Sequence, residues 1–170
     1  MNAADWKLLL YLRPGDFLCP DQMQSSIVIA LDRFIGQVGS RPVIVSDYRP
    51  GDTGQHGRGF AVDTTWPGHE PLDIWSRAVS SRLFSGLGIY VNEVGAVSFH
   101  FDTRLDRNVS SPALWGAVIT HPLDPDSGQH LQLNEYTTAD VILDIIKKKG
   151  VVLIISLGVF LLLYYLTRRR

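Results

Sequence analysis

The stretch SFHFD, at residues 98–102, decides the fold because its polar and aromatic residues alternate. In a β-strand, successive side chains point to opposite faces of the sheet. Phe99 and Phe101 are therefore expected to face a hydrophobic core. The polar residues share the other face: Ser98, His100 and Asp102.

A second strand is predicted at FAVDTTW, residues 60–66, where Ala61 and Asp63 share one face. It follows a loop in which glycines around His56 let the backbone turn tightly. If the two strands are neighbours, His56, Asp63 and His100 converge on one point. Two imidazoles and a carboxylate with an open fourth position form a catalytic zinc arrangement. Taken singly, His56 is equally typical of a surface loop, and Asp63 of a turn or cap at a strand end.

The remaining pattern predicts an α+β fold with a small, mainly antiparallel sheet and helices on one side. Apolar residues at helical spacing predict a helix over residues 21–38, with Asp21 as its N-cap and Gly39 at its end. A second helix is predicted over residues 70–83, with Pro71 near its first turn. After an irregular lead-in over residues 1–20, strands are expected at 41–51, 60–66, 86–91 and 96–103, the last two as an antiparallel pair.

The C-terminal part of the sequence predicts a membrane anchor. The stretch at residues 150–166, GVVLIISLGVFLLLYYL, carries no charge and is close to the length that a helix needs to cross a bilayer. Basic residues flank it on both sides, and the alternative of a buried core helix is disfavoured because such a helix is rarely apolar on every face. The predicted organisation is a domain over residues 1–120, a polar linker with the start of the anchor helix over 121–146, and a single-pass transmembrane anchor over 147–170.

The charge distribution excludes some classes of partner. Six of the 16 basic residues flank the predicted anchor, which leaves 10 basic and 17 acidic residues, or about −7, in the body of the chain. An acidic body argues against a nucleic-acid partner. The single cysteine, Cys19, excludes an intrachain disulfide and a cysteine-based zinc site. The N-terminus lacks the basic region and cleavage site of a signal peptide.

Several motifs together resemble the zinc D-Ala-D-Ala carboxypeptidase family, in the branch of small bacterial and phage peptidoglycan peptidases that share a fold with the hedgehog signalling domain. The most specific is the H-x-x-G-x-A-x-D motif at residues 56–63. The resemblance covers about residues 12–116. Its supporting motifs are LRPGDFLCP (12–20), RPVIVSDYRPG (41–51), GLGIY (86–90), FHFDTR (99–104) and LWG (114–116).

This resemblance implies Zn²⁺ held by His56, Asp63 and His100, and Arg49 facing the carbonyl or carboxylate of a peptidoglycan peptide. Zinc lowers the pKa of its bound water to about 7 and polarises the scissile carbonyl. Arg49 can brace the developing oxyanion or hold a terminal carboxylate. Asp102 is expected either to hydrogen-bond a ligating histidine or to pair with a surface cation such as Arg104.

The chain departs from the family at the general base, a carboxylate usually found three residues before the last zinc histidine. Val97 occupies that position here, and Glu93 and Asp102 are the candidate replacements. A missing base typically costs a factor of about 10² to 10⁴ in rate. The sequence therefore predicts a membrane-anchored zinc peptidase, with a catalytically impaired, zinc-containing wall-binding or structural membrane protein as the alternative. An anchored wall enzyme without a signal peptide is expected in a bacteriophage, in the host inner membrane or the virion membrane.

Overall fold

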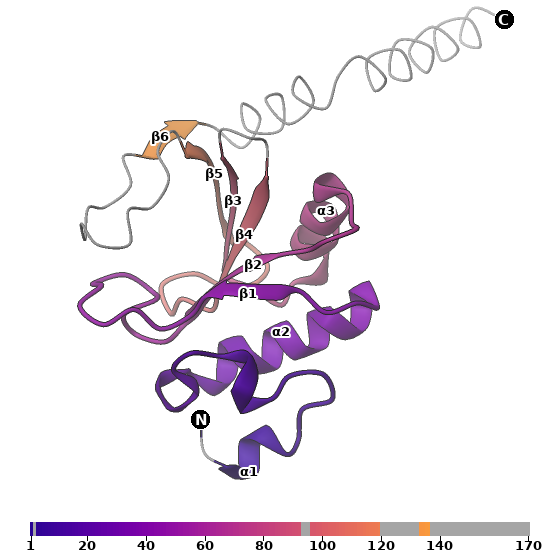
Figure 1. Ribbon diagram of the computed structural model, residues 1–170. Coiled ribbons are helices and arrows are strands. Elements are labelled where there is room, and N and C mark those ends of the chain that lie inside the picture. Colours follow the sequence, from indigo (N-terminus) through magenta and orange to yellow (C-terminus); the bar gives the residue numbers. More distant parts are fainter. Residues whose placement is uncertain (2, 93–95, 120–132, 137–170) are drawn as a thin grey trace, which may run out of the picture.

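The structure is a computed structural model that describes residues 1, 3–92, 96–119 and 133–136 of the 170-residue chain. Six strands form one mixed sheet in the order β1-β2-β4-β3-β5-β6 (Figure 1). The strands are β1 (Val43–Ser46), β2 (Ala61–Thr65), β3 (Gly86–Asn92), β4 (Val97–Asp102), β5 (Ala113–Ile119) and β6 (Leu133–Tyr136). The helices are α1 (Ala3–Trp6), α2 (Ser25–Val38) and α3 (Pro71–Ser81), with 3₁₀ turns η1 (Pro14–Asp16) and η2 (Pro20–Gln22).

The predicted α+β class and the antiparallel pairing of β3 with β4 are confirmed. β3 also pairs in parallel with β5, a contact that the sequence did not predict. β6, which pairs with β5, lies inside the stretch over residues 121–146 that was predicted as a linker with the start of the anchor helix. The rest of that stretch and the predicted anchor lie outside the described residues. Within the described part of the chain, no helix is long and apolar enough to cross a membrane.

Helices α2 and α3 cover one face of the sheet, as predicted. Phe99 and Phe101 of β4 belong to a single buried cluster with side chains from both helices. The ring of Phe34, from α2, lies at the centre of this cluster, with centroids 5.5 Å from Phe84 and 5.6 Å from Phe101. Because side chains alternate along a strand, this packing commits Ser98, His100 and Asp102 to the opposite face.

The first long helix begins later than predicted. Residues 20–22 form η2, and the backbone of Gln24 is extended because its N–H donates to the carbonyl of Gly59. α2 therefore starts at Ser25 rather than at Asp21. It ends as predicted, at Gly39, whose φ of 81° allows the left-handed C-cap.

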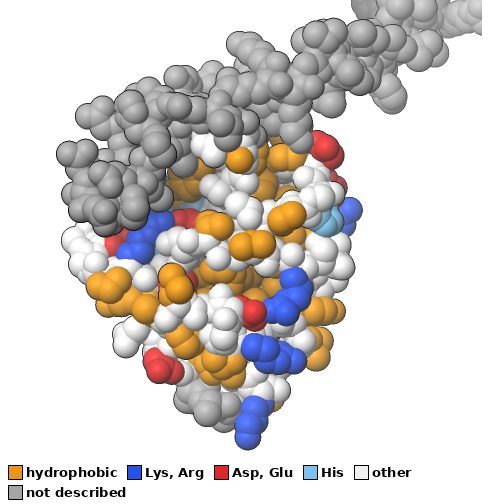
Figure 2. Space-filling model, viewed as in Figure 1, with side chains coloured by type: hydrophobic (Ala, Val, Ile, Leu, Met, Phe, Trp, Pro, Cys, Tyr) orange, Lys and Arg blue, Asp and Glu red, His pale blue; other side chains and the backbone are white. Residues whose placement is uncertain are grey.

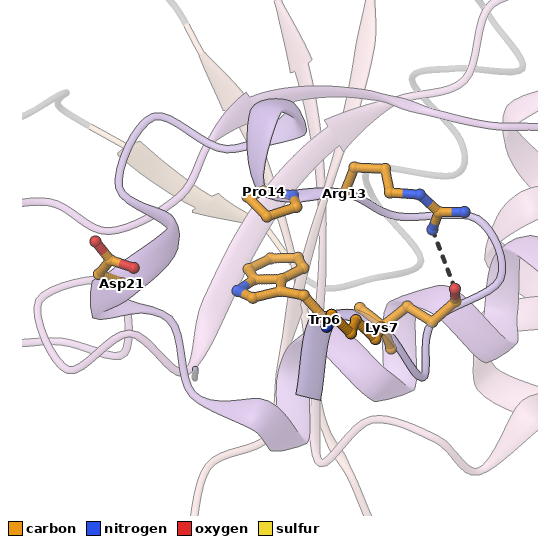
Figure 3. A pocket seen from close by; sticks show the side chains of 6 residues that line it. Trp6, Lys7, Arg13, Pro14 and Asp21 are labelled. Carbon is orange, nitrogen blue, oxygen red and sulfur yellow. Dashed lines mark hydrogen bonds between the residues drawn. The ribbon is translucent and has the colours of Figure 1, made fainter. Parts of the chain in front are cut away.

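The N-terminal segment packs on the side of α2 that faces away from the sheet (Figure 1). Trp6 lies against Phe17, with ring centroids 5.4 Å apart, and beside Pro14 at a shallow pocket (Figure 3). Arg13 closes the turn by donating from Nη1 to the carbonyl of Leu9, at 3.0 Å. The N-terminal segment, which was predicted to be an irregular lead-in, is therefore part of the folded domain.

A buried carboxylate fastens this segment to α2. Oδ1 of Asp32 accepts hydrogen bonds from the backbone N–H groups of Tyr11 and Leu12, at 2.7 and 2.9 Å. Oδ2 accepts from the N–H of Leu10, at 3.1 Å. Asp32 is 6% exposed, so these donors have little access to water if the carboxylate is removed.

Hydrophobic side chains also reach the surface. Figure 2 shows them spread between polar and charged side chains over one face of the molecule. Leu8, Leu10 and Leu18, all in the N-terminal segment, are at least 75% exposed. Scattered apolar side chains are normal on folded proteins and need no functional explanation.

We expect Asp32→Ala to lower the free energy of unfolding by about 2 to 4 kcal/mol, because it leaves three backbone donors without an acceptor. Guanidinium denaturation followed by circular dichroism measures the change. The matched control is Asp73→Ala, which removes an exposed carboxylate paired with Arg77 and should cost less than about 1 kcal/mol. Equal losses in the two variants would contradict the role of Asp32.

Candidate metal centre

The register between β2 and β4 brings the first two site residues together. Asp63 of β2 lies directly opposite His100 of β4. Directly opposed residues on antiparallel strands share a face, with Cβ atoms about 5 Å apart. Nδ1 of His100 lies 2.9 Å from Oδ1 of Asp63. The predicted proximity of these two residues is therefore present in the structure.

His56 reaches the same point from the loop before β2. Its carbonyl accepts from the N–H of Gly59, at 3.0 Å, in a tight turn. Gly57 packs against the backbone of Asp52 so closely that an added Cβ would lie 1.6 Å from the carbonyl oxygen. Gly59 has a φ of 73° and touches the backbone of Gln22. These glycines are therefore required for the loop to hold His56 over the sheet.

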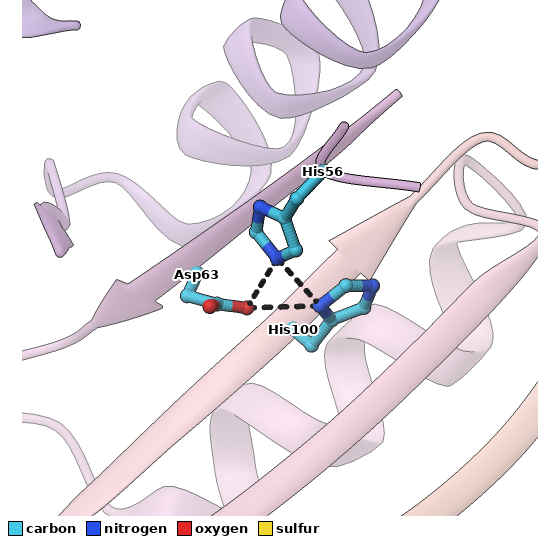
Figure 4. A group of neighbouring side chains, drawn as sticks. All are labelled: His56, Asp63 and His100. Atoms are coloured by element: carbon cyan, nitrogen blue, oxygen red, sulfur yellow. Dashed lines mark hydrogen bonds and ion pairs between the residues drawn. The ribbon is translucent and has the colours of Figure 1, made fainter. Parts of the chain in front are cut away.

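Three donor atoms converge on one point (Figure 4). Nε2 of His56 lies 3.2 Å from Nδ1 of His100 and 3.2 Å from Oδ1 of Asp63. The residues are buried, with exposed fractions of 4 to 8%. In a tetrahedral zinc site with bonds near 2.0 to 2.1 Å, neighbouring ligand atoms are about 3.3 Å apart. The geometry of His56, Asp63 and His100 therefore fits a divalent metal ion.

The outer partners of both imidazoles determine which nitrogen carries the proton. Nδ1 of His56 lies 2.6 Å from the backbone carbonyl of Asp47, which can only accept, so this nitrogen carries hydrogen. Nε2 of His100 donates in the same way to Oδ2 of Asp102, at 3.1 Å. In the neutral rings, the lone pairs therefore lie on the nitrogens that face Asp63. Two lone pairs and a carboxylate oxygen with no hydrogen between them favour a shared cation.

Contacts between the charged groups of the site shift the pKa values of Asp63 and His100. Burial opposes ionisation of Asp63, but hydrogen bonds and charge interactions with His100 and His56 outweigh it and hold the pKa of the carboxyl well below its usual range. Burial also disfavours the charged form of His100, yet its contacts with Asp102 and Asp63 raise the pKa of the imidazole. The charged groups around the three donor atoms thus favour a positively charged species between them.

Asp102 supports His100 from behind. It is fully buried, and its carboxylate accepts from Nε and Nη2 of Arg104 at 2.6 to 3.1 Å as well as from His100. Burial raises the pKa of Asp102, but these contacts lower it to about 2. Both roles that the sequence left open, a partner for a ligating histidine and a partner for Arg104, are present together. Metal-ligating histidines are commonly oriented by such a carboxylate.

A pocket of about 490 Å³ opens beside the three donors. Arg49 lines it, and its Nη2 pairs with Oδ2 of Asp63 while its Nε donates to Ser46, at 2.8 Å. The register of β1 shifts between Ile44 and Ser46, which places Ser46 opposite Asp63. Arg49 is 48% exposed, so the structure brings this predicted residue to both the candidate metal site and the pocket.

Other residues of the pocket were not identified from the sequence. Asp52, from the loop before His56, lines the pocket. Tyr90 and Trp115 form one wall, in which Nε1 of Trp115 donates to the Tyr90 hydroxyl, at 2.9 Å. Burial raises the pKa of Tyr90 to about 12, so the hydroxyl keeps its proton at neutral pH. The sequence signal for this wall was Gly88, inside a predicted strand. An added Cβ there would lie 2.6 Å from the Trp115 ring, so glycine leaves room for the ring.

Three positions were connected with the missing base from the sequence, and the structure describes two of them. Val97 packs against the hydrophobic core, on the face of β4 opposite to His100. Glu93 lies outside the described residues. Asp102 is buried behind His100 and does not line the pocket, whereas Asp52 does.

We expect the purified full chain to carry about one zinc ion, since its described residues offer one three-donor site. His100→Asn should reduce zinc affinity by more than the roughly 10- to 100-fold that is typical of losing an outer partner. Asp102→Asn should fall within that range. Metal content by mass spectrometry and competition titration with a fluorescent chelator measure both effects.

Two matched controls accompany these variants. His69→Asn removes a half-buried histidine that bonds Ser40 outside the site, and Asp106→Asn removes an exposed carboxylate near Asp102 in the chain. Both should retain zinc at the affinity of the unaltered protein. Loss of zinc in His69→Asn but not in His100→Asn would contradict the assignment.

Comparisons with protein-family models, with curated proteins and with solved structures give no match for this chain. The family resemblance of its motifs therefore stays a prediction, and the interpretation of the site depends on the chemistry of the residues themselves.

Proposed function

We propose that this protein is a zinc-dependent peptidase that cleaves stem or cross-bridge peptides of peptidoglycan. The observation that carries the proposal is the convergence of two imidazole lone pairs and one carboxylate oxygen beside an open pocket. Three protein ligands with a free fourth position are typical of catalytic zinc, whereas structural zinc sites are usually closed by four. The order of the motifs along the chain also supports the hedgehog/DD-peptidase-like fold as part of this proposal.

The pocket has the chemistry that a peptide substrate needs. Its volume lies within the range of about 300 to 1,000 Å³ that is usual for small-molecule sites. Arg49 offers a half-exposed guanidinium for a terminal carboxylate or a carbonyl oxygen. Val45 and the ring of Trp115 provide apolar surface for short side chains such as that of alanine. A small peptide with a nearby carboxylate fits this combination.

The residues of the chain can then be given roles in hydrolysis. Bound zinc would supply a water of lowered pKa and polarise the scissile carbonyl. Asp52 is the candidate proton acceptor, because it lines the pocket and, among the described residues, only its Oδ1 accepts a hydrogen bond, from the N–H of Gly54 at 2.6 Å. Tyr90 keeps its proton and can donate it to the developing oxyanion, together with Arg49.

A non-catalytic zinc module is the second candidate. It is favoured by Val97, which leaves the position of the usual base without a carboxylate, and by the ion pair that already occupies Arg49. In that case the protein binds wall peptides without cleaving them. The two candidates share the metal centre and differ in turnover.

Incubation of the full chain with purified peptidoglycan fragments separates them. We expect release of new amino or carboxyl termini, detected by mass spectrometry, and loss of release on addition of a chelator. Asp52→Asn should lower the rate by a factor of about 10² to 10⁴ if Asp52 accepts the proton. It should leave zinc content unchanged, because Asp52 is not among the three donors.

Asp16→Asn provides the control, since this carboxylate pairs with Arg41 away from the pocket and should leave release unaltered. Zinc binding without any release would favour the non-catalytic module. Release that persists with the chelator would contradict the zinc peptidase.

We also propose that residues 150–166 anchor the protein in the host inner membrane or in a virion membrane, because this stretch is uncharged and flanked by basic residues. Cys19 is a free, partly exposed thiol and reports on which side the domain lies. A membrane-impermeant maleimide should label it in intact virions, or in cells after the membrane is breached. Labelling that requires added detergent both in virions and throughout infection would contradict exposure of the domain to the wall.

A further inference from the structure

A second pocket, of about 560 Å³, is lined by arginines and lies between α2, the end of α3 and the segment after β4. Arg33 comes from α2, Arg82 from the end of α3, and Arg104 and Arg107 follow β4. Four of its 12 lining residues are arginines and none is acidic. The three candidate metal ligands do not line it, and Arg104 is the one residue that it shares with the pocket beside them.

Among the residues that the structure describes, three of these guanidinium groups have no acidic partner. Arg104 is held by Asp102 and stacks over the Trp115 ring, at 4.9 Å from its centroid. Within the part of the chain that the structure describes, Arg33, Arg82 and Arg107 form no salt bridge. Arginines elsewhere on the domain, such as those at 41 and 77, are paired with aspartates. The pocket therefore concentrates positive charge that the fold does not neutralise.

This concentration is unusual because the body of the protein is acidic. The body carries 10 basic and 17 acidic residues, and four of the 10 basic residues line this one pocket. Like charges gathered in a concave surface repel one another and raise the local concentration of anions. A bound anion would remove that repulsion.

The backbone at Arg82 points to a use for its side chain. Arg82 has a φ of 55° in the left-handed region, where it ends α3, and it is the only described non-glycine residue with a positive φ. Glycine or asparagine is the usual residue at such a position. Strained positions of this kind recur at binding sites, where the surrounding structure maintains them. Here the strain places an arginine at the rim of the cationic pocket.

We propose that this pocket binds a phosphate group, either as the free ion or on a lipid headgroup. A phosphate monoester has close to two negative charges and three acceptor oxygens, which suits several guanidiniums better than a single carboxylate does. The hydroxyls of Ser26 and Thr103, which are hydrogen-bonded to each other at 2.7 Å, also line the pocket, and the one that accepts in this pair can donate its own proton to a ligand. Ile29 and Leu83 add apolar surface for the rest of the ligand.

Isothermal titration of the full chain in a nonionic detergent, at constant ionic strength, tests the proposal with inorganic phosphate, pyrophosphate and dihexanoyl phosphatidic acid. We expect saturable binding of at least one of them. Arg33→Gln and Arg107→Gln should each weaken it by about tenfold, the usual size of one charge-assisted hydrogen bond. Arg82→Asn tolerates the left-handed backbone and should have a similar effect.

Arg77→Gln is the matched control, because it removes a paired arginine of α3 that does not line the pocket. It should leave binding unchanged, and all four variants should keep their zinc content. Tighter binding of the phospholipid than of phosphate would identify a lipid headgroup as the source, and equal binding would identify the phosphate alone. Absence of saturable binding of all three probes, or equal losses in Arg77→Gln and Arg33→Gln, would overturn the proposal.

Discussion

The structure depends on the register in which β2 pairs with β4. Phe101 faces Val62 across the two strands and both belong to the core, while the next pair along, Asp63 and His100, lies on the opposite face. Because the side-chain period of a strand is two, a slip by one residue would exchange these sets. The burial of the aromatic residues therefore fixes the candidate metal ligands, although none of the ligands contributes to the core. Stability and site geometry are set by the same pairing.

The pairing of β3 with β4 and β5 explains why β3 carries two glycines. Gly86 lies opposite Asp102, and an added Cβ there would be 2.3 Å from the carboxylate. Gly88 lies opposite His100 and beneath the ring of Trp115. Glycine in a strand is destabilising by roughly 0.5 to 1 kcal/mol relative to alanine. The absence of side chains at these two positions leaves the space in which a buried carboxylate orients His100 and a tryptophan lines the pocket.

Short-range patterns predicted a large part of this arrangement. The alternation at residues 98–102 indicated correctly which side chains face the core, and the glycines around His56 indicated a tight loop. The parallel pairing of β5 could not be predicted in this way, since it depends on contacts between distant segments rather than on local spacing. The carbonyl of Asp47, which orients His56, leaves no trace in residue identity because every residue has a carbonyl. Asp52 lies in a segment whose residues are typical of an ordinary turn, and only the folded loop brings it into the pocket lining.

Strand geometry restricts where the proposed general base can lie. A residue three positions before His100 on a regular strand must face away from it, because an odd separation changes the face. β4 is paired with β3 without interruption from Val97 to Asp102, so the regular geometry extends over this whole interval. A carboxylate substituted at Val97 would therefore enter the core side of the sheet and would not reach the candidate metal site. Any base in this protein must come from a residue that lines the pocket on the other face, and among the described acidic residues outside the metal ligands that residue is Asp52.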